Sequence, residues 1–388
     1  MKNILFVFGT RPEAIKMAPL VIKAKQDSRF NVFVCSTGQH REMLKPILNF
    51  FEIVPDLDLD LMKPGQTLAD VSVAVLQGVD AIFKQKSFSA VVVQGDTTSC
   101  FMGGLAAFYH KVPVVHIEAG LRSGDIFSPF PEEFNRKATG LLAHLHFAPT
   151  ETSRANLLNE HYPSSRIFVT GNTGIDALFA VRERLAANQS LKEQFEQHFA
   201  FLDIRKKLIL VTVHRRESFG EPMEEVMKGL KALSKRSDVE LLIPLHMNPQ
   251  VRESAKKIFG SDAKWVNETS THKLGTAKIW LCEPVDYIPF VYLMNRAFLI
   301  ITDSGGVQEE APSLGKPILV AREKTERPEA ITAGTSKLIP LQEHAFLRMA
   351  EEIINDSGTY LQMAQAQNPF GDGQACGRIL EKMAELLP

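Results

Sequence analysis

The chain contains few cysteines, and they form no pattern. Of its 388 residues only four are cysteine, at positions 35, 100, 282 and 376, and no two of them form a CxxC pair or lie at the spacing of metal ligands. This distribution disfavours a disulfide framework and a cysteine-based zinc site. We expect reduced and mostly buried thiols, as in a cytoplasmic protein.

Long apolar runs are also missing. The first apolar run, 4–8, is short and leads directly into Thr10-Arg11-Pro12-Glu13, so we expect no signal peptide. No run reaches the roughly 20 apolar residues of a membrane span. The formal net charge is -1, which gives no indication of a nucleic-acid or membrane partner. An anionic ligand would have to be bound by local cations and backbone N–H groups.

The common nucleotide-binding loops are absent as well. The loop at 9–16 reads GTRPEAIK, which matches neither GxGxxG nor GxxxxGK[ST]. The sequence therefore does not support NAD or ATP binding, and we expect no dissociable cofactor. We also expect no metal site. His144 and His146 alternate on one apolar run, but no third ligand lies near them in sequence, and packing is the simpler interpretation.

Short apolar runs recur along the chain, each followed by Gly, Pro, Asp or Ser and then by a helix-like stretch. Continuous apolar character is typical of strands buried on both faces, and alternation with helices is typical of open parallel sheets. Six runs in each half of the chain fit this pattern: 4–8, 32–35, 90–93, 114–117, 146–148 and 167–169, then 208–213, 241–244, 279–282, 298–301, 318–320 and 338–339.

The length of the chain exceeds that of one ordinary core, and the pattern of runs breaks near 171–180. We predict an α/β fold of two Rossmann-like, doubly wound domains facing a cleft, 1–172 and 173–367. An amphipathic tail helix, about 368–388, is expected to pack back on the first domain. Ligands of open α/β sheets bind beyond the carboxyl ends of the strands. Functional residues should therefore follow the strands directly.

Three acidic residues in the first half have this position. Asp96 follows the third run, Glu118 follows the fourth, and Glu132 opens a helix after a proline-stiffened loop. Each also has a simpler interpretation: Asp96 as a helix cap, Glu132 as a partner of the helix dipole, and Glu118 as the partner of Arg122 or another cation. A partly buried Glu118 would have a raised pKa, which suits general acid or base catalysis. Together the three acids indicate proton transfer.

Cations accompany these acids. Arg11 and Lys16 lie in the first strand-to-helix loop, where the helix N-terminus would offer free N–H groups to a phosphate. An ordinary turn with basic side chains is an equally good interpretation. In the second half, His214 and Arg215 follow the first strand and indicate a diphosphate site, with a structural histidine as the alternative. His246 also follows a predicted strand, but it indicates a diphosphate site less clearly.

The clearest local signal is the run TDSGGVQEE at 302–310. Gly305 and Gly306 would let a phosphate approach backbone N–H groups at a helix N-terminus, and Ser304 adds a hydroxyl. Glu310 is placed to accept hydrogen bonds from ribose hydroxyls. Arg327, after the next strand, has the reach to contact the same phosphates.

These motifs together resemble one known family. The segments GTRPEAIKMAPL, QHREML, GDTT, HIEAGLR, PEEFNR, HRRESFG, TDSGGVQEEAPSLGKP, TERPEA and GDGQA, in this order, look like the bacterial non-hydrolysing UDP-N-acetylglucosamine 2-epimerases. The resemblance runs nearly end to end. It implies a glycosyltransferase-B-like pair of domains, a homodimer, and conversion of UDP-N-acetylglucosamine to UDP-N-acetylmannosamine for surface polysaccharides. Hydrolysing relatives, transferases on the same two-domain frame and an inert sugar-nucleotide sensor are the alternatives.

The resemblance also implies roles for single residues. Asp96, Glu118 and Glu132 resemble the acid/base carboxylates of the family. Its substrate and diphosphate contacts correspond to Arg11, Lys16 and His214, and its UDP-binding residues to Ser304, Glu310 and Arg327. Some members have a second, regulatory UDP-N-acetylglucosamine site, to which the motifs of Gln39, Arg215 and His246 contribute. The chain departs from those members at 62–66, where it reads MKPGQ without their arginine.

The chemistry of such an epimerase explains its residue types. The hydrogen on carbon-2 of the sugar is not acidic in the ground state, and the sequence shows no NAD fingerprint for transient oxidation. Breaking the anomeric C–O bond first makes this hydrogen acidic, so a carboxylate can remove it to give 2-acetamidoglucal and UDP. The leaving diphosphate needs cations and helix N-termini, and the two faces of the sugar need carboxylates. The sequence does not assign each carboxylate to a face.

Overall fold

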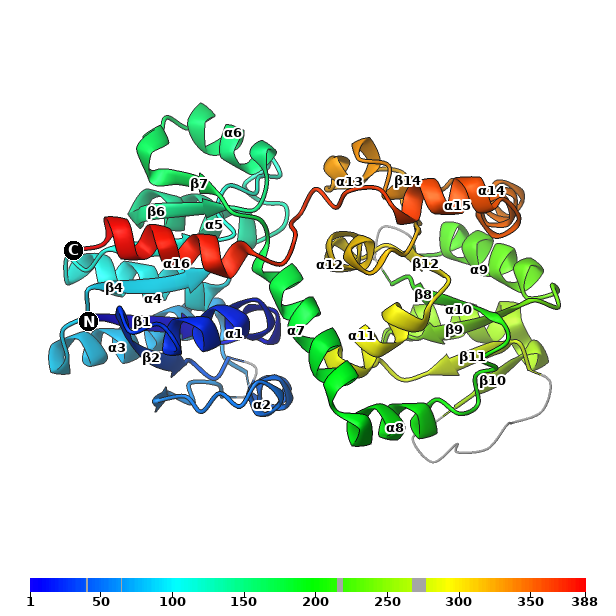
Figure 1. Ribbon diagram of the computed structural model, residues 1–388, viewed down its shortest axis with the longest axis horizontal. Helices are drawn as coiled ribbons and strands as arrows, with labels where there is room; N and C mark the ends of the chain where they lie inside the picture. The colour runs from blue at the N-terminus through cyan, green and yellow to red at the C-terminus, as the bar shows by residue number, and fades with distance from the viewer. Residues whose placement is uncertain (40, 64, 215–218, 267–276) are drawn as a thin grey trace. The chain divides into compact units, whose positions relative to one another are not determined.

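The computed structural model describes residues 1–39, 41–63, 65–214, 219–266 and 277–388. The chain divides into two compact units, Met1–Ala180 with Phe370–Pro388, and Val181–Pro369. Each unit contains a seven-stranded sheet whose paired strands are all parallel, with helices on both faces (Figure 1). The predicted fold class of two doubly wound, Rossmann-like α/β domains is confirmed. The expected boundary at 172 lies next to the start of helix α7, and the division between the units falls further along that helix.

The sheet of unit 1 has the strand order β3-β2-β1-β4-β5-β6-β7. Six of these strands therefore follow the order 3-2-1-4-5-6 of dinucleotide-binding folds, and β7 extends the far edge. The strands are β1 (Lys2–Phe8), β2 (Phe30–Ser36), β3 (Leu57–Asp58), β4 (Ala90–Gln94), β5 (Val114–Ile117), β6 (Ala143–Ala148) and β7 (Ile167–Val169).

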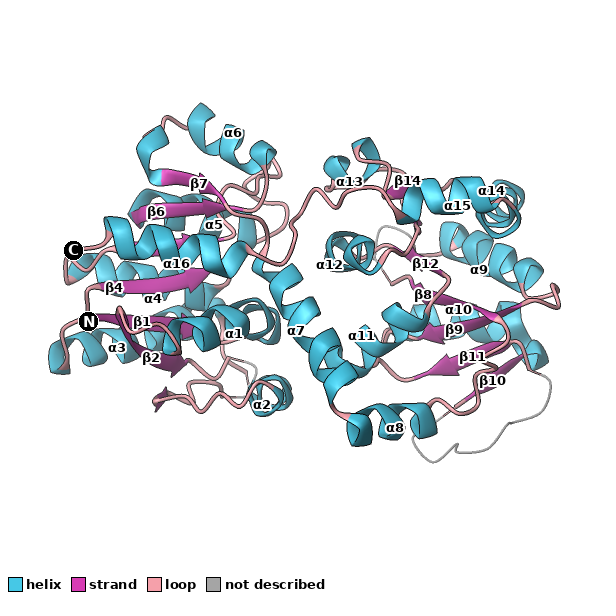
Figure 2. Cartoon of the chain, viewed as in Figure 1, coloured by secondary structure: helices cyan, strands magenta, loops and turns pink. Residues whose placement is uncertain are grey.

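Helices cover both faces of this sheet (Figure 2). They are α1 (Arg11–Lys25), α2 (Arg41–Phe50), α3 (Leu68–Gln85), α4 (Thr98–Tyr109), α5 (Glu132–Leu142), α6 (Glu151–Asn159), α7 (Thr173–Ala187) and α16 (Ala375–Leu386), with a 3-10 turn at Ser164–Arg166.

The sheet of unit 2 has the order β10-β11-β9-β8-β12-β13-β14. Its strands are β8 (Lys207–Thr212), β9 (Val239–Pro244), β10 (Ala263–Trp265), β11 (Ile279–Cys282), β12 (Leu299–Thr302), β13 (Ile318–Val320) and β14 (Ser336–Leu338). Its helices are α8 (Gln189–His198), α9 (Glu221–Leu233), α10 (Pro249–Phe259), α11 (Tyr287–Arg296), α12 (Gly305–Glu310), α13 (Pro328–Thr332), α14 (Glu343–Asn355) and α15 (Ser357–Ala364), with 3-10 turns at Gly260–Asp262 and Ala311–Leu314.

Both faces of each sheet are buried, as the continuous apolar runs predict. In β1, Leu5 and Val7 pack in the cluster that includes α3 and α4. Their neighbours Ile4, Phe6 and Phe8 point to the opposite face and are also fully buried. In unit 2 the core on one face combines β8, β9 and β12 with α9, α10 and α14.

The sequence prediction missed two strands, β3 and β10. Both lie at the edge of their sheet and pair with one neighbour only, over two and three residues. Such short edge strands hold too few residues to show a periodic apolar signal. The run predicted at 338–339 also lies slightly earlier, as β14 at Ser336–Leu338.

The C-terminal helix α16 belongs to unit 1, where it packs against α1 (Figure 1). The Nζ of Lys2 donates a 2.9 Å hydrogen bond to the carbonyl of Ala384. At the other end of the helix, the carboxylate of Asp176 in α7 accepts hydrogen bonds from the N–H groups of Ala375 and Cys376, at 3.2 and 2.9 Å. A side chain of α7 thus satisfies backbone donors that the helix leaves open.

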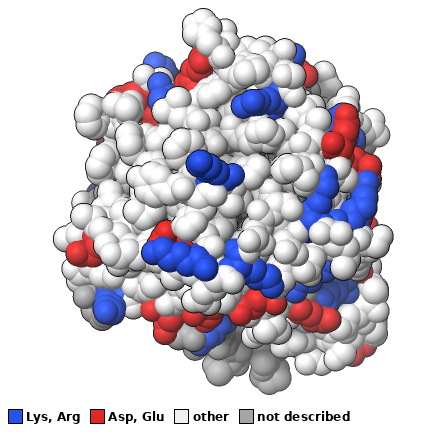
Figure 3. Space-filling model, turned by 90° about the vertical axis from the view of Figure 1, so that its left-hand side faces the viewer, with Lys and Arg blue, Asp and Glu red and all other residues white. Residues whose placement is uncertain are grey.

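The four cysteines are free, and three of them are fully buried. No helix in the described part of the chain is long and apolar enough to cross a membrane. One end of unit 1 shows a broad area without charged side chains (Figure 3). Large apolar side chains of this unit stay exposed on α3, α4 and α5 and in the loop before α5: Val73, Phe108, Tyr109, Phe127, Phe130, Phe134 and Leu141.

Two buried histidines make the stability of unit 1 depend on pH. His116 in β5 and His146 in β6 are paired in register, and each is 1% exposed. Burial lowers the pKa of His116 to about 4 and that of His146 to about 3. An unfolded histidine takes up a proton below about pH 6.5, whereas these two stay neutral. The free energy of unfolding should therefore fall as the pH decreases from about 6.5 towards 4.

We predict that His116→Gln weakens this pH dependence. Its amide can keep the 2.8 Å hydrogen bond to the carbonyl of Gly95, but it does not titrate. Urea unfolding at several pH values should show a slope smaller by up to about 1.4 kcal/mol per pH unit than in the unchanged protein. The exposed His344 provides the control, and His344→Gln should leave the slope unchanged. An equal slope in His116→Gln would contradict the prediction.

Candidate functional site

Glu118 is the centre of a hydrogen-bonded cluster at the carboxyl edge of the first sheet. It directly follows β5, and its side chain is 7% exposed. The Nζ of Lys16, from α1, lies 2.5 Å from Oε1. Gln94, the last residue of β4, donates to Oε2, and Asn172, which follows β7, donates to Oε1 at 3.4 Å. Four elements that are distant in sequence thus meet at one carboxylate.

The backbone of Glu118 is strained. Its φ is +62°, in the left-handed region that non-glycine residues rarely adopt. Such conformations persist where the surrounding structure imposes them, and they occur often at functional sites. Here the neighbouring strands and three side-chain donors hold the residue. The arrangement fixes the direction of one carboxylate at the end of β5.

The cation that pairs with Glu118 is Lys16. Arg122, which the sequence offered as a partner, instead binds Glu160 through two hydrogen bonds of 2.6 and 2.8 Å. Glu118 and Lys16 were assigned to proton transfer and to substrate binding, respectively, and the structure brings them together as an ion pair. The sequence did not foresee this contact, because the two residues are 102 positions apart.

Asp96 forms a second charged cluster beside the first. Its carboxylate lies 2.8 Å from the guanidinium of Arg136, which also binds the fully buried Glu133 at 3.0 Å. Burial opposes the charge of Arg136, but the two carboxylates prevail and raise its pKa. The amide of Asn135 donates to the main-chain carbonyl of Asp96. Asp96 is thus held by an ion pair, and Thr97 provides the cap of α4 through the N–H of Cys100.

Glu132 is the first residue of α5 and is half-buried, which agrees with a place at the positive end of the helix dipole. Its side chain forms no hydrogen bond or ion pair with another described residue. Of the three predicted acids, Asp96 and Glu118 are therefore bound to cations. Glu132 differs from both in this respect.

In the loop before α1, several of the N–H groups that the sequence predicted to be free are already bound. The carboxylate of Glu13 accepts hydrogen bonds from the N–H groups of Gly9 and Thr10, at 3.1 and 2.8 Å, and from the hydroxyl of Thr97 at 2.7 Å. The hydroxyl of Thr10 in turn caps the N–H of Glu13, which completes a capping box. Pro12 has no N–H at all. The N–H groups of Gly9 and Thr10 are thus occupied by Glu13, and burial raises the pKa of its carboxyl.

Gly9 in this loop is constrained by space. A Cβ at this position would lie 2.0 Å from Oγ1 of Thr37 and 2.5 Å from Oγ of Ser99. Gln39, predicted for a regulatory site, lies beside this loop and accepts a 3.0 Å hydrogen bond from Ser99. Arg11 is half-buried at the first position of α1. Both side chains therefore belong to the carboxyl edge of the first sheet.

Asp303 holds His214 of unit 2 in position. The side chain of Asp303 is fully buried and accepts a 2.6 Å hydrogen bond from the N–H of His214, whose Nδ1 lies 3.5 Å from the other carboxylate oxygen. The ring of His246 stacks on that of His214, with centroids 5.1 Å apart and planes at 6°. The Nδ1 of His246 accepts from the N–H of Asn248 at 3.1 Å. The two predicted histidines therefore form one pair of parallel rings.

The Ser-Gly-Gly turn begins α12 as predicted. Ser304 is the N-cap, and among the described residues its side chain makes no capping hydrogen bond. A Cβ added at Gly306 would meet nothing within 4 Å, and one at Gly305 would lie 3.5 Å from Nη2 of Arg327. Arg327 binds the buried Glu309 through its Nε. The start of α12 is thus open to approach, with a guanidinium beside it.

Glu310 lies near a buried phenol. Burial and the neighbouring Glu310 carboxylate hold the pKa of the Tyr287 hydroxyl well above its usual range. The hydroxyl of Tyr287 therefore stays protonated. Arg215, the remaining predicted contact, lies outside the described residues.

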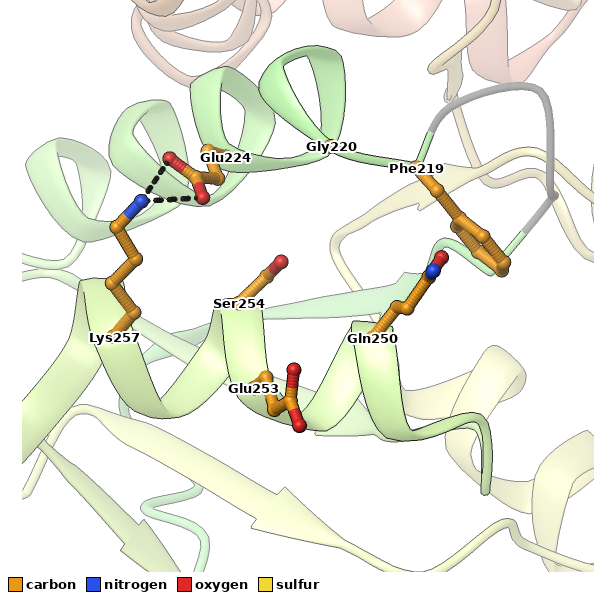
Figure 4. A pocket seen from close by; sticks show the side chains of 7 residues that line it. All are labelled: Phe219, Gly220, Glu224, Gln250, Glu253, Ser254 and Lys257. Atoms are coloured by element: carbon orange, nitrogen blue, oxygen red, sulfur yellow. Dashed lines mark hydrogen bonds and ion pairs between the residues drawn. The ribbon is translucent and has the colours of Figure 1, made fainter.

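A surface pocket of about 620 Å³ in unit 2 is separate from these residues (Figure 4). It lies between α9 and α10, and Lys257 closes one side through hydrogen bonds of 2.6 and 2.8 Å to Glu224. Its lining consists of Phe219, Gly220, Glu224, Gln250, Glu253, Ser254 and Lys257. None of the predicted site residues belongs to it, and we do not assign the site to this pocket.

Five supporting residues were missed in the sequence. Each of them lies near a predicted site residue in the structure: Glu13, Gln94, Arg136, Asn172 and Asp303. Three of them were within reach of the argument used for the others, because Gln94, Asn172 and Asp303 lie at or just after a strand end. Glu13 lies in the first turn of α1, within a capping box with Thr10. Arg136 lies one turn into α5, where nothing in the sequence marks its partner.

The fold and the strand-end clusters define a two-domain α/β protein of the Rossmann-like, glycosyltransferase-B-like class, with charged clusters at the carboxyl edges of its sheets. A family model described as UDP-N-acetylglucosamine 2-epimerase matches residues 22–384. The chain belongs to this family.

Individual relatives agree with this assignment. The UDP-N-acetylglucosamine 2-epimerase of Yersinia pestis is 50% identical over 382 residues, which cover 98% of each chain. The crystal structure of the Neisseria meningitidis epimerase bound to UDP-GlcNAc is 44% identical, with a TM-score of 0.86 over 99% of this chain and 100% of that one. The Methanocaldococcus jannaschii epimerase in complex with UDP-GlcNAc and UDP is 30% identical, with a TM-score of 0.76 over 99% of each chain.

A more distant likeness concerns the fold alone. MurG of Acinetobacter baumannii is 14% identical, with a TM-score of 0.61 over the full length of both chains. At this identity the likeness shows a shared two-domain architecture.

We predict that Glu13→Ala destabilises unit 1 by about 2–4 kcal/mol. The change leaves the N–H groups of Gly9 and Thr10 buried without their partner, at a cost of about 1–3 kcal/mol each. Urea unfolding would measure the loss. Glu13→Gln keeps one oxygen for these donors and should cost clearly less, whereas a similar loss in both variants would contradict the assigned role. Glu42→Gln, on the exposed first turn of α2, is the control.

Proposed function

We propose that the protein interconverts UDP-N-acetylglucosamine and UDP-N-acetylmannosamine without net hydrolysis, by elimination of UDP and its re-addition to 2-acetamidoglucal. The product would feed surface polysaccharide synthesis in the cytoplasm. Membership in the family supports the substrate class. The observation that carries the proposal is the cluster around Glu118, where a buried carboxylate is fixed at a strand end beside a lysine and a second ion-paired acid, Asp96.

The chemistry requires a carboxylate that is ionised and correctly directed before it removes the carbon-2 proton. Lys16 binds one oxygen of Glu118, and Gln94 donates to the opposite oxygen, so the direction of the carboxylate is fixed. Asp96 is held in the same way by Arg136. Glu132, without such a cation among the described residues, completes the set of carboxylates that exchange protons with the two faces of the sugar.

The leaving diphosphate requires positive charge. In unit 2 we assign this task to His214, to the N–H groups that begin α12 at Gly305 and Gly306, and to Arg327. Ser304 adds a hydroxyl, and Glu310 binds the ribose. From unit 1, Arg11 and Lys16 add cations, and Arg215 is proposed from its motif alone.

We predict exchange at carbon-2 as the signature of this mechanism. The protein is incubated with UDP-N-acetylglucosamine in deuterium oxide without added NAD, and the sugar is followed by proton NMR. UDP-N-acetylmannosamine with deuterium at carbon-2 should appear. Accumulation of free N-acetylmannosamine with UDP would instead indicate the hydrolysing reaction. Absence of turnover and exchange in a folded sample that binds UDP would refute both.

Replacing the carboxylates separates catalysis from binding. We predict that Glu118→Gln, Asp96→Asn and Glu132→Gln each lower kcat by about 100-fold or more, because each removes a proton-transfer group. UDP binding, measured by calorimetry, should change little, because none of the three carboxylates is among the assigned UDP contacts. A variant that kept full turnover would exclude its residue from the catalytic set.

We also propose that the protein is a homodimer. The support is the group of exposed apolar side chains on α3 to α5, since exposed apolar patches often mark interfaces. Leu141 is 77% exposed, and Phe108 is 54% exposed. Both line a surface pocket at the end of α4 and α5.

We predict that Leu141→Glu weakens the dimer at least about tenfold, because a buried glutamate loses its hydration and leaves an apolar contact unmade. Size-exclusion chromatography with light scattering, over a range of protein concentrations, would measure the change. Ile204→Glu is the matched control, since Ile204 is 88% exposed and lies in unit 2. A monomeric unchanged protein, or equal behaviour of both variants, would contradict the assignment.

A further inference from the structure

Three donors bind Glu118, and one of them has no role in the reaction described so far. We propose that Asn172 is a positioning residue that keeps the Glu118 carboxylate in its catalytic direction. The inference deepens the proposed epimerase function and depends on it. Asn172 contacts neither the sugar nor the diphosphate in this proposal, and it acts only through Glu118.

Asn172 is 3% exposed and is held by hydrogen bonds that include three with described residues. Its N–H donates to the carbonyl of Phe370 at 2.7 Å. Its Oδ1 accepts from the N–H of Gly174 at 2.8 Å, at the start of α7. Its Nδ2 donates to Oε1 of Glu118 at 3.4 Å. Because the N–H of Gly174 requires an acceptor, the amide oxygen is assigned to α7, and the NH₂ group must face Glu118.

The backbone around Asn172 is held by close packing of two chain segments. Gly171 has a φ of +90°, and a Cβ there would lie 3.3 Å from the Cα of Gly371. These glycines let the segment that enters α7 and the segment that returns to α16 lie in direct contact. The position of Asn172 is therefore set by the main chain on both sides.

The amide of Asn172 can hold the Glu118 carboxylate throughout the reaction, whereas Lys16 cannot. Lys16 and Asn172 bind the same oxygen of Glu118, and Lys16 is also assigned to the substrate. When Lys16 turns towards the diphosphate, Asn172 and Gln94 still hold both carboxylate oxygens. The present 3.4 Å distance is long for a hydrogen bond, and catalytic hydrogen bonds often shorten only when substrate is bound.

The surroundings of Glu118 define what a charge at position 172 would change. Lys16 from α1 is ion-paired with Glu118, and a Cβ on Gly95, next to Asp96, would lie 3.7 Å from Oε2. Glu13, Asp96 and Glu118 all act on the thiol of Cys100 in α4. From its own strand, His116 is buried and neutral. From α4, Cys100 is buried, and burial keeps the pKa of its thiol well above its usual range. A carboxylate at 172 would therefore act on Glu118 as a new like charge.

The test compares Asn172→Asp with Asn172→Ala. Aspartate can still accept the N–H of Gly174, but it replaces the donor facing Glu118 by a negative charge. We expect kcat to fall about tenfold or more, with KM nearly unchanged. Glu118→Gln should remove one limb of the pH profile of kcat/KM. In Asn172→Asp this limb should move to higher pH by about one unit or more. Asn172→Ala should shift this limb in the same direction by a smaller amount and lower Tm.

A matched control separates this effect from capping and net charge. Asn188 caps α8 by accepting the N–H of Leu191 at 3.0 Å, and it is exposed, so Asn188→Asp adds the same charge at a cap remote from any carboxylate cluster. It should leave the profile unchanged. Equal profiles of Asn172→Asp and the unchanged protein would overturn the inference, as would a loss in KM alone. Because the unchanged protein is assayed in parallel, its lack of epimerase activity would count against the proposed function and not against the role of Asn172.

Discussion

The ion pair between Lys16 and Glu118 is the contact on which the first site depends. It joins α1 to the end of β5, and Gln94 and Asn172 add donors from β4 and from the entry to α7. Partly buried charges are costly unless they are paired and hydrogen-bonded, so each added donor makes the arrangement more definite. The strained backbone of Glu118 is held by these same contacts. In the proposed reaction, a carboxylate fixed in this way would need no rearrangement before it accepts a proton.

Asp303 has the corresponding position in unit 2. Its buried carboxylate binds the N–H of His214, and Thr302 before it binds both the hydroxyl of Thr212 and the N–H of Ser304. Side chains at and just after the carboxyl ends of β8 and β12 thus join the two strand ends. The start of α12 is positioned by the same network. In both units, buried polar side chains between neighbouring strand ends place the groups that face a ligand.

The sequence predicted the strands and the strand-end residues well, because burial on both faces and the alternation of strand and helix leave clear local patterns. It failed where the outcome depends on distant contacts. Lys16 and Glu118 are 102 positions apart in the sequence. Asn172, which binds the same carboxylate, follows β7 and is also distant from Glu118 in the sequence. The free donors expected before α1 are bound by Glu13, a local contact that the capping pattern of Thr10 and Glu13 already contained.

The N–H groups before α1 and those at the start of α12 differ in whether they are available to an anion. Before α1 the N–H groups of Gly9 and Thr10 are bound by a buried carboxylate, and the side chains of Lys16 and Arg11 are the cations proposed there. At α12 the cap residue Ser304 makes no side-chain bond with the described residues, and both glycines leave the backbone accessible. Helix N-termini stabilise negative charge only where their N–H groups are available. In the proposed mechanism, backbone N–H groups that stabilise the diphosphate are therefore assigned to unit 2, and the carboxylates that transfer protons are assigned to unit 1.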